Sequence, residues 1–286
     1  MSLKKMFKTA PLPFQGQKRR FAGGFATALS ELKAKQDVKI VIDLFGGSGL
    51  LAHIAKHIIP EAKVIYNDYD NYSQRLMNID KTNKLLDDIR FLLDGIPRDK
   101  QRIDEQRKAK ILDRIAQDDK DGYVDYITLS ASLLFSAKYA LTLEDFSKEH
   151  FYNRVKASAY DFDPDEYLAG LDVVRVDYKE LYNQYKDVSG VVFVVDPPYL
   201  STDTSTYNSD KYWRLRDYLD VLNVLIDTNY IFFTSNKSSL IELCEWLDDN
   251  KKEFSNPFAR SVLNTQNVTI NKDAKYTDMM LYRFIK

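Results

Sequence analysis

The sequence predicts a Rossmann-like α/β sheet, mostly parallel, that carries a mainly helical insert. Two strand-like runs lead to this prediction. The first, Val38–Leu44, is rich in β-branched residues and runs directly into the glycine turn DLFGGSG. The second, Val191–Val195, has five apolar residues in a row and runs into Asp-Pro-Pro-Tyr. Unbroken apolar runs of this length are typical of strands buried on both faces of a parallel sheet.

The first part of the chain reads as a strand–helix–strand unit of a nucleotide-binding sheet. After the strand at Val38–Leu44, a helix is expected over Leu50–Ile59, and Pro60 ends it. A short strand follows at Ala62–Tyr66, and a long helical stretch then continues to about Leu93. A strand, a glycine turn, a helix and a second strand ending in an acid form the usual nucleotide-binding order.

The alternation of predicted strands and helices stops between Gly95 and Gly170. Within this region Arg98–Gln117 is charged and helix-prone, Tyr123–Leu141 is apolar enough to form a docked helix, and Phe151–Tyr167 is aromatic and irregular. We therefore expect an inserted region at residues 95–170 and a core domain made of residues 1–94 and 171–286.

The alternation resumes after the insert and ends in a hairpin. Further strands are expected at Leu171–Val176 and Tyr230–Thr234, and further helices at Tyr178–Tyr185, Tyr212–Ile226 and Ser238–Asp248. The last two strands, Ser261–Ile270 and Thr277–Phe284, flank the polar turn NKDAKY, which predicts an antiparallel hairpin at the edge of the sheet.

The composition excludes several classes of protein. The 286 residues carry a net charge of -1, so partners such as nucleic acid would need a local basic face. The single cysteine and three histidines rule out a disulfide framework and a Cys/His zinc cluster, and His53 and His57 are read as surface residues. Without a membrane-length apolar segment or a signal-like start, we expect a soluble, cytoplasmic protein with no metal site.

The glycine turn Asp43–Gly49 favours a cationic ligand over a phosphate. Its glycines match the GxGxxG pattern of dinucleotide enzymes only loosely, and Asp43 would repel a pyrophosphate. Asp68 ends the next strand, where nucleoside-binding folds place an acid on the ribose hydroxyls. A solvated acid in a turn is an equally good interpretation of Asp68 on its own.

The stretch Asp196–Tyr199 follows a buried strand, at the sheet edge where ligands bind in open α/β folds. Pro197 and Pro198 fix the backbone and lack N–H donors, which leaves their carbonyl groups rigidly placed as acceptors. A carboxylate, a fixed carbonyl and the Tyr199 ring together suit an exocyclic amino group on a planar base. A chance Asp-Pro-Pro turn is the weaker explanation at this position.

These motifs resemble the Dam-type adenine-N6 DNA methyltransferases, which use S-adenosylmethionine. The order is similar: PFQGQK at Pro13–Lys18, then DLFGGSG, then the insert, then DPPY. FFTSNK at Phe232–Lys237 and the ending at Tyr276–Phe284 resemble the family's late strands. The resemblance implies a methyltransferase sheet and a target-recognition region in the insert. Inside the insert, no stretch resembles the family's DNA-reading hairpin.

The resemblance also implies roles for individual residues. Catalysis would fall to Asp196, Pro197, Pro198 and Tyr199. The expected cofactor-binding residues come from the first motif, the glycine turn and two strand ends: Phe14, Gln15, Gly16, Gln17, Lys18, Asp43, Leu44, Phe45, Gly46, Gly47, Gly49, Asp68, Tyr69, Asp177 and Tyr178. Candidate nucleic-acid contacts are Arg19, Arg20, Lys108 and Tyr207.

The implied chemistry explains the acidic strand ends, because the methyl donor is a sulfonium cation. Hydrogen bonds from the adenine amine to Asp196 and the Pro197 carbonyl would make the amine more nucleophilic, and in-line transfer then needs only alignment. The base would be flipped out of the duplex onto Tyr199, and the loop Ser201–Tyr207 is expected to close over it. Cys244 lies in a predicted helix and has no role.

The resemblance extends to partners and leaves alternatives open. We expect double-stranded DNA as the substrate, a monomer, a bacterial or phage origin, and room for a cognate restriction endonuclease. Cytosine-N4 transfer and an RNA adenine target involve the same amine chemistry. A nicotinamide-dependent oxidoreductase would leave DPPY unexplained, and a DNA-binding protein with a silent site is a further alternative.

Overall fold

The computed structural model describes residues 5–98, 101–135, 138–198, 213–251, 254–269 and 275–285. The chain forms two compact units. The core unit consists of Met1–Thr9, Gly16–Asp70 and Asp165–Lys286, and the insert unit of Ala10–Gln15 and Asn71–Pro164. Among the described residues, no helix combines the length and apolarity that crossing a lipid bilayer requires.

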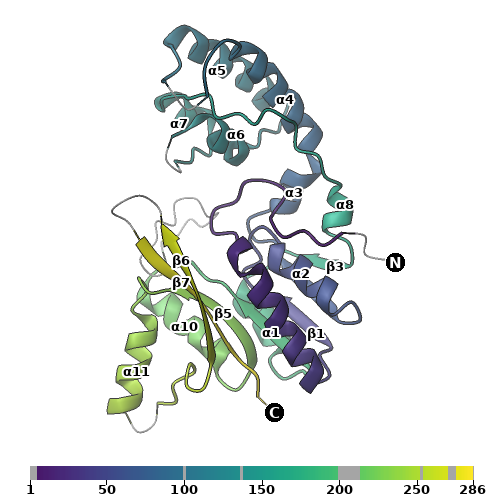
Figure 1. The fold of residues 1–286 in the computed structure, drawn as a ribbon, viewed down its shortest axis with the longest axis vertical. Helices are drawn as coiled ribbons and strands as arrows, with labels where there is room; N and C mark the ends of the chain where they lie inside the picture. The colour runs from purple at the N-terminus through teal and green to yellow at the C-terminus, as the bar shows by residue number, and fades with distance from the viewer. Residues whose placement is uncertain are drawn as a thin grey trace. The chain divides into compact units, whose positions relative to one another are not determined.

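A seven-stranded sheet forms the centre of the core unit (Figure 1), in the order β3-β2-β1-β4-β5-β7-β6. The strands are β1 (Ile40–Asp43), β2 (Lys63–Asn67), β3 (Leu171–Val174), β4 (Val191–Val195), β5 (Asn229–Ser235), β6 (Val262–Thr269) and β7 (Lys275–Arg283). The first five are parallel, and β7 pairs antiparallel with both β5 and β6. The predicted fold class, including the antiparallel C-terminal hairpin, is confirmed.

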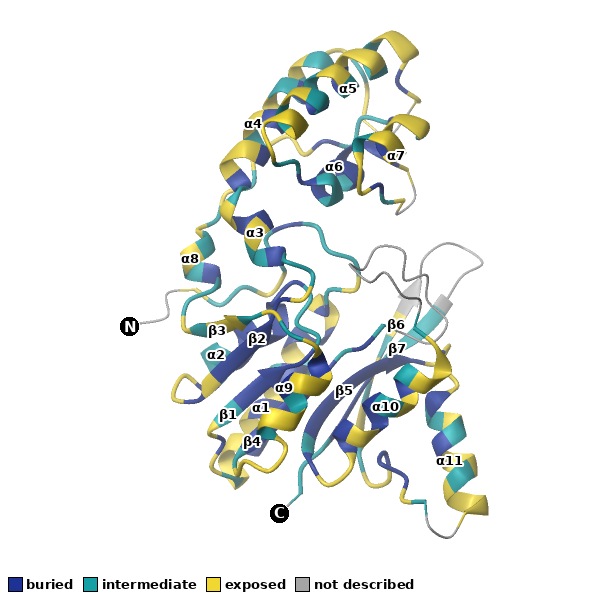
Figure 2. Cartoon of the chain, turned by 180° about the vertical axis from the view of Figure 1, so that it is seen from behind, coloured by how far each residue is buried: buried dark blue, intermediate teal, exposed yellow. Residues whose placement is uncertain are grey.

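Helices cover both faces of this sheet. One apolar cluster joins α1 (Ala22–Lys35) and α2 (Leu50–Ile58) to one face of the strands. A second joins α9 (Tyr178–Tyr185), α10 (Leu215–Leu225) and α11 (Leu240–Asn250) to the other. All five residues of β4 are consequently buried, and Figure 2 shows the central strands as the most buried part of the core unit. This coverage explains why β4 reads as an unbroken apolar run.

Several elements differ from the sequence prediction. The helix α1 was not anticipated, and the helical stretch after Asp68 breaks at Asn78 into α3 (Tyr72–Met77) and α4 (Ile79–Leu92). The helix expected over Tyr123–Leu141 is only α6 (Tyr126–Leu133). The remaining helices are the short 3₁₀ turn η1 (Arg19–Phe21), α5 (Glu105–Lys120), α7 (Leu143–Lys148) and α8 (Pro164–Tyr167).

The insert unit has an apolar core of its own, built from α4, α5, α6 and α7. The side chains of Ile89, Ile111, Ile115, Leu129 and Phe146 are fully buried in it. Burial at i and i+4 on α5 accounts for a helix whose other positions are mostly charged. A separate core supports the description of this region as a compact unit.

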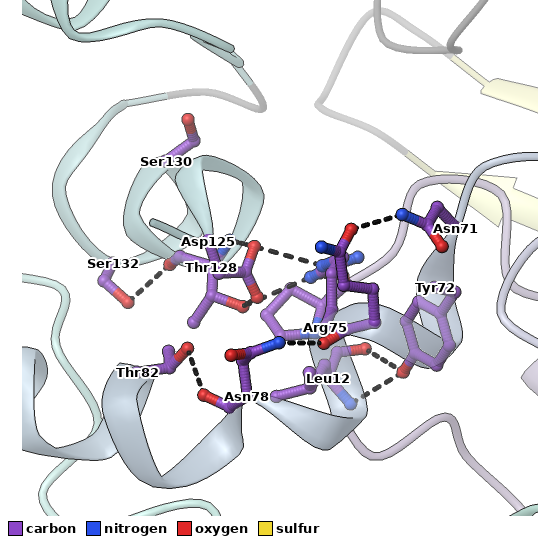
Figure 3. Close-up of polar contacts among 12 residues, drawn as sticks. Leu12, Asn71, Tyr72, Arg75, Asn78, Thr82, Asp125, Thr128, Ser130 and Ser132 are labelled. Atoms are coloured by element: carbon purple, nitrogen blue, oxygen red, sulfur yellow. Dashed lines mark hydrogen bonds and ion pairs between the residues drawn. The ribbon is translucent and has the colours of Figure 1, made fainter. Parts of the chain in front are cut away.

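A buried arginine binds the N-terminal segment to this unit (Figure 3). Arg75 on α3 donates from Nε to Asp125 Oδ1 at 3.0 Å and from Nη2 to the Pro13 carbonyl at 2.8 Å. The Tyr72 hydroxyl lies 2.9 Å from the Leu12 nitrogen and 3.1 Å from the Leu12 carbonyl oxygen. Residues 10–15 are therefore part of the insert unit although they are distant from it in sequence.

Candidate functional site

Three carboxylates follow neighbouring strands at one edge of the sheet. Asp43 ends β1, Asp68 follows β2 and Asp196 follows β4, and these strands are adjacent and parallel. The register holds the loops in place, because Leu44 N–H donates to the Val194 carbonyl at 3.0 Å and Asp68 N–H to the Val174 carbonyl at 2.8 Å. This is the carboxyl edge, where open α/β sheets bind their ligands.

The glycine turn after β1 has a conformation that needs glycine. Gly47 and Gly49 have φ angles of 50° and 71°, and Gly49 N–H donates to the Gly46 carbonyl at 2.7 Å. A Cβ at Gly46 would overlap the ring of Tyr66 and lie 2.9 Å from the Asn67 carbonyl oxygen. The turn therefore packs directly against β2 and leads into the N-terminus of α2.

Asp43 is a buried acid whose carboxylate is poorly compensated. Its exposure is 1%, and the Ala52 and Phe45 N–H groups approach its carboxylate without reaching full hydrogen-bond geometry, so neither oxygen has a well-formed hydrogen bond within the described part of the chain. Burial and the charge of Asp196 raise the pKa of Asp43 to about 8, against the opposing effects of the Ala52 N–H and the Lys18 ammonium. A buried carboxylate with so little compensating positive charge suits a cationic ligand.

Asp196 uses its two oxygens differently. Oδ2 lies 2.5 Å from Lys18 Nζ, and Lys18 also donates to the Gly16 carbonyl at 2.8 Å. Oδ1 is buried and has no hydrogen-bond partner among the residues described. Burial raises the pKa of Asp196, and the Lys18 ammonium lowers it. Lys18 therefore favours the carboxylate form while one acceptor oxygen stays available.

Asp278 on β7 is a further acid that interacts electrostatically with Asp196 and Lys18. Its pKa is raised by burial and by Asp196, and lowered by Lys18 and Arg20. The Oδ1 atom is buried without a hydrogen-bond partner in the described structure. Asp278 lies in the late-strand stretch Tyr276–Phe284 that resembles the family, but it was not predicted as a site residue. No neighbouring residue in the sequence distinguishes its side chain from a solvated acid.

Asn67 joins the loops on either side of β2. Its side-chain amide donates to the Leu44 carbonyl at 3.0 Å and to the Val176 carbonyl at 2.9 Å, and its oxygen accepts from Val176 N–H at 3.1 Å. No role for Asn67 was predicted from the sequence. Through these bonds it fixes the glycine turn relative to the segment that leads to Asp177.

Aromatic rings gather beside the glycine turn. Phe45 lies 4.7 Å from Tyr178 and 5.8 Å from Trp213, measured between ring centroids. The Tyr178 hydroxyl is buried and meets no partner in the ranges that the structure describes. Asp177 is exposed and caps α9 by accepting from Lys179 N–H at 2.7 Å. Trp213 is a further residue that sequence reasoning missed.

Other predicted residues are placed as follows. Gly16, Gln17 and Lys18 belong to the core unit, whereas Phe14 and Gln15 belong to the insert unit. Tyr69, Arg19 and Arg20 are exposed, and Lys108 donates to the Ser147 carbonyl at 2.7 Å. Pro197 and Pro198 follow Asp196 without regular structure. Tyr199, Tyr207 and the loop between them lie outside the described residues.

One expectation about the histidines is wrong. His53 is not a surface residue, since its exposure is 1% and its ring contacts Phe7 N–H at 2.9 Å and the Tyr167 carbonyl at 2.7 Å. Burial lowers its pKa to about 4. No group of three potential metal-binding side chains occurs among the described residues.

The sheet order, the glycine turn after β1 and the acids after neighbouring parallel strands are typical of nucleotide-binding α/β sheets, whose ligands bind at this edge. A profile of the D12 class N6 adenine-specific DNA methyltransferase family matches residues 14–277. A protein of Haemophilus influenzae (strain ATCC 51907 / DSM 11121 / KW20 / Rd) described as "Putative methyltransferase" is 36% identical over 285 residues, covering 99% of this chain and 95% of that protein. The chain belongs to the D12 class N6 adenine-specific DNA methyltransferase family and is an enzyme.

Proposed function

We propose that this protein transfers a methyl group from S-adenosylmethionine to the N6 amine of adenine in double-stranded DNA. The observation that carries the proposal is the divided carboxylate of Asp196, with Oδ2 on Lys18 and Oδ1 buried without a partner in the described structure. A carboxylate with one oxygen available can accept an N–H of the target amino group and so make its nitrogen more nucleophilic.

The residues at the sheet edge fit S-adenosylmethionine. The two unpartnered oxygens of Asp43, counted over the described residues, suit a ligand that carries positive charge, and the Gly46 backbone allows close approach. Asp68 is proposed to accept the ribose hydroxyls. Phe45 and Tyr178, whose rings lie 4.7 Å apart between centroids, are proposed to contact the adenine ring. When bound, the cofactor supplies an electrophilic methyl group.

The chain's own contribution is to orient and polarise the target amine. Asp196 Oδ1 accepts one N–H, and the Pro197 carbonyl accepts the other. Both bonds draw electron density toward the amine nitrogen, whose lone pair is otherwise delocalised into the base. Lys18 favours the ionised form of Asp196 against the effect of burial, and transfer then depends on alignment and charge placement.

Adenine must leave the duplex to reach Asp196. Flipping costs a few kcal/mol, and stacking on Tyr199 would return roughly 1–3 kcal/mol. The insert unit is the proposed target-recognition region, because it is a separate compact unit within the family match. Phosphate contacts are proposed for the exposed Arg19 and Arg20.

The proposal is tested by incubating the protein with labelled S-adenosylmethionine and DNA of varied sequence, and then digesting the DNA to nucleosides. Labelled N6-methyl-2′-deoxyadenosine supports the proposal, whereas label in N4-methyl-2′-deoxycytidine contradicts it. Transfer to RNA but not to DNA, in a parallel incubation with RNA, also contradicts it. Asp196→Ala and Tyr199→Ala should reduce transfer to background. Asp187→Ala, at an exposed position after α9, is the matched control and should match wild type.

A further inference from the structure

The Tyr66 side chain on β2 lies beneath the glycine turn. It is fully buried, and its hydroxyl donates to the Gly47 carbonyl at 2.7 Å. Its ring fills the space that a Cβ would need at Gly46, and a Cβ at Gly49 would lie 3.1 Å from Tyr66 Cζ. One side chain therefore contacts three residues of the turn.

The same hydroxyl also lies 3.0 Å from Asp68 Oδ1. A phenol has one proton to donate, so the Gly47 carbonyl and the Asp68 carboxylate share it. Burial and the charge of Asp68 raise the pKa of Tyr66, which keeps this proton on the phenol. Tyr66 thus joins the turn after β1 to the acid after β2.

Tyr167 on α8 holds the next carbonyl of the turn. Its hydroxyl donates to the Ser48 carbonyl at 2.9 Å. Its ring stacks on His53 of α2 at 4.8 Å between centroids, and its own carbonyl contacts His53 Nδ1 at 2.7 Å. Two tyrosines from distant parts of the sequence therefore bind consecutive carbonyl groups, those of Gly47 and Ser48.

We propose that Tyr66 and Tyr167 are positioning residues for the cofactor, a role that rests on the proposed function. They hold the glycine turn in its binding conformation before the cofactor arrives, and Tyr66 also orients Asp68. Preorganisation of this kind increases affinity, because less conformational freedom is lost on binding. Neither side chain is required to touch the reacting methyl group or the target amine.

The test compares Tyr66→Phe and Tyr167→Phe with Tyr230→Phe by titration calorimetry with S-adenosylmethionine. Tyr230 is the matched control: it is buried in the core unit, and its hydroxyl donates to the Pro257 carbonyl at 2.7 Å near the start of β5. We expect about tenfold weaker binding for Tyr66→Phe, a smaller loss for Tyr167→Phe, and unchanged affinity for Tyr230→Phe. The KM for the cofactor should rise while kcat at saturation stays near wild type.

Hydrogen exchange of the Gly46–Gly49 amides in the ligand-free protein gives a second measurement. Exchange should accelerate in Tyr66→Phe and remain unchanged in Tyr230→Phe. Combining Tyr66→Phe with Asp68→Asn should weaken binding by less than the product of the two single effects, since the hydroxyl acts partly through Asp68.

The outcomes separate this inference from the proposed function. If wild type does not bind S-adenosylmethionine, the proposed cofactor is wrong and the inference fails with it. If wild type binds but Tyr66→Phe and Tyr167→Phe bind equally well, with unchanged exchange of the turn, only the positioning role is overturned.

Discussion

The ammonium of Lys18 lies 2.5 Å from Asp196 Oδ2, while Oδ1 of the same carboxylate is buried and unpartnered among the residues described. The pair joins the first motif of the family to the one after β4. Lys18, which was predicted as a cofactor contact, is thus paired with the predicted catalytic acid. Through this ion pair Lys18 can set the charge and orientation of Asp196 directly.

Replacing Lys18 with methionine should shift the acidic limb of the pH–kcat profile to higher pH. The Lys18 ammonium lowers the pKa of Asp196, so its removal favours the protonated acid. A protonated carboxyl oxygen is a poor acceptor for the N–H of the target amine. Lys18→Arg, which keeps the charge, should retain the wild-type limb. Identical limbs in all three proteins would contradict the role assigned to this ion pair.

Replacing Asp43 with asparagine should stabilise the ligand-free protein at pH 8. The folded pKa of about 8 lies above the usual 3.8, so the native state holds a proton that the unfolded chain releases. The free energy of unfolding of wild type should therefore fall between about pH 4 and pH 8, by at most about 1.4 kcal/mol per pH unit. The thermal midpoints of wild type and Asp43→Asn should differ most at pH 8 and converge toward pH 4. Midpoints that stay the same distance apart across this range would contradict the raised pKa of Asp43. The variant should also bind S-adenosylmethionine more weakly.

Replacing Gly46 with alanine should displace the glycine turn, because the added Cβ meets the Tyr66 ring and the Asn67 backbone. Overpacking of this kind costs about 1–3 kcal/mol of stability. We expect cofactor affinity, measured by calorimetry, to fall at least about tenfold. Gly23→Ala on α1 is the control, since nothing lies within 4 Å of its added Cβ. Equal affinity in both variants would mean that the turn does not contact the cofactor.

Replacing Arg75 with methionine should destabilise the insert unit selectively. It leaves Asp125, 4% exposed, as a buried charge without its ion-pair partner, which typically costs about 3–5 kcal/mol. Both tryptophans, Trp213 and Trp246, lie in the core unit, so their fluorescence reports on that unit alone. Hydrogen exchange should accelerate in α6 while the tryptophan transition changes little. A purely uniform loss of protection would refute a local role.

DNA affinity should fall as salt concentration rises. Removing one side chain that binds a phosphate should reduce the slope of log K against log salt by about 1. Arg19→Ala and Arg20→Ala should each reduce this slope, as measured by fluorescence anisotropy with a labelled duplex. Lys33→Ala, which removes an exposed cation paired with Glu61 on the core unit, is a suitable comparison. Unchanged slopes in both arginine variants would remove them from the DNA-binding surface.

The sequence was sufficient where local pattern determines structure. β4 occupies the predicted residues because a run of five apolar residues is buried on both faces only inside the sheet. α9 also occupies the predicted residues, and Asp177 caps its N-terminus. Gly23 and Gly24 concealed α1, since glycine is a poor helix former. In the insert, apolar residues predicted burial over Tyr123–Leu141, but they did not predict that the helix would end at Leu133.

The site was predictable only in its individual parts. Asp43, Asp68 and Asp196 could be singled out because each ends or directly follows a recognisable strand. The pairing of Lys18 with Asp196 depends on tertiary structure, as does the buried hydroxyl of Tyr66 under the glycine turn. Tyr66 reads in the sequence only as the last apolar residue of a strand.

Residues 10–15 belong to the insert unit, held there by Arg75 and Tyr72, although the chain on either side of them belongs to the core unit. A chimera that exchanged only residues 71–164 with a relative would pair a native N-terminal segment with foreign side chains. Domain exchange in this enzyme would therefore have to transplant two separate stretches of sequence at once.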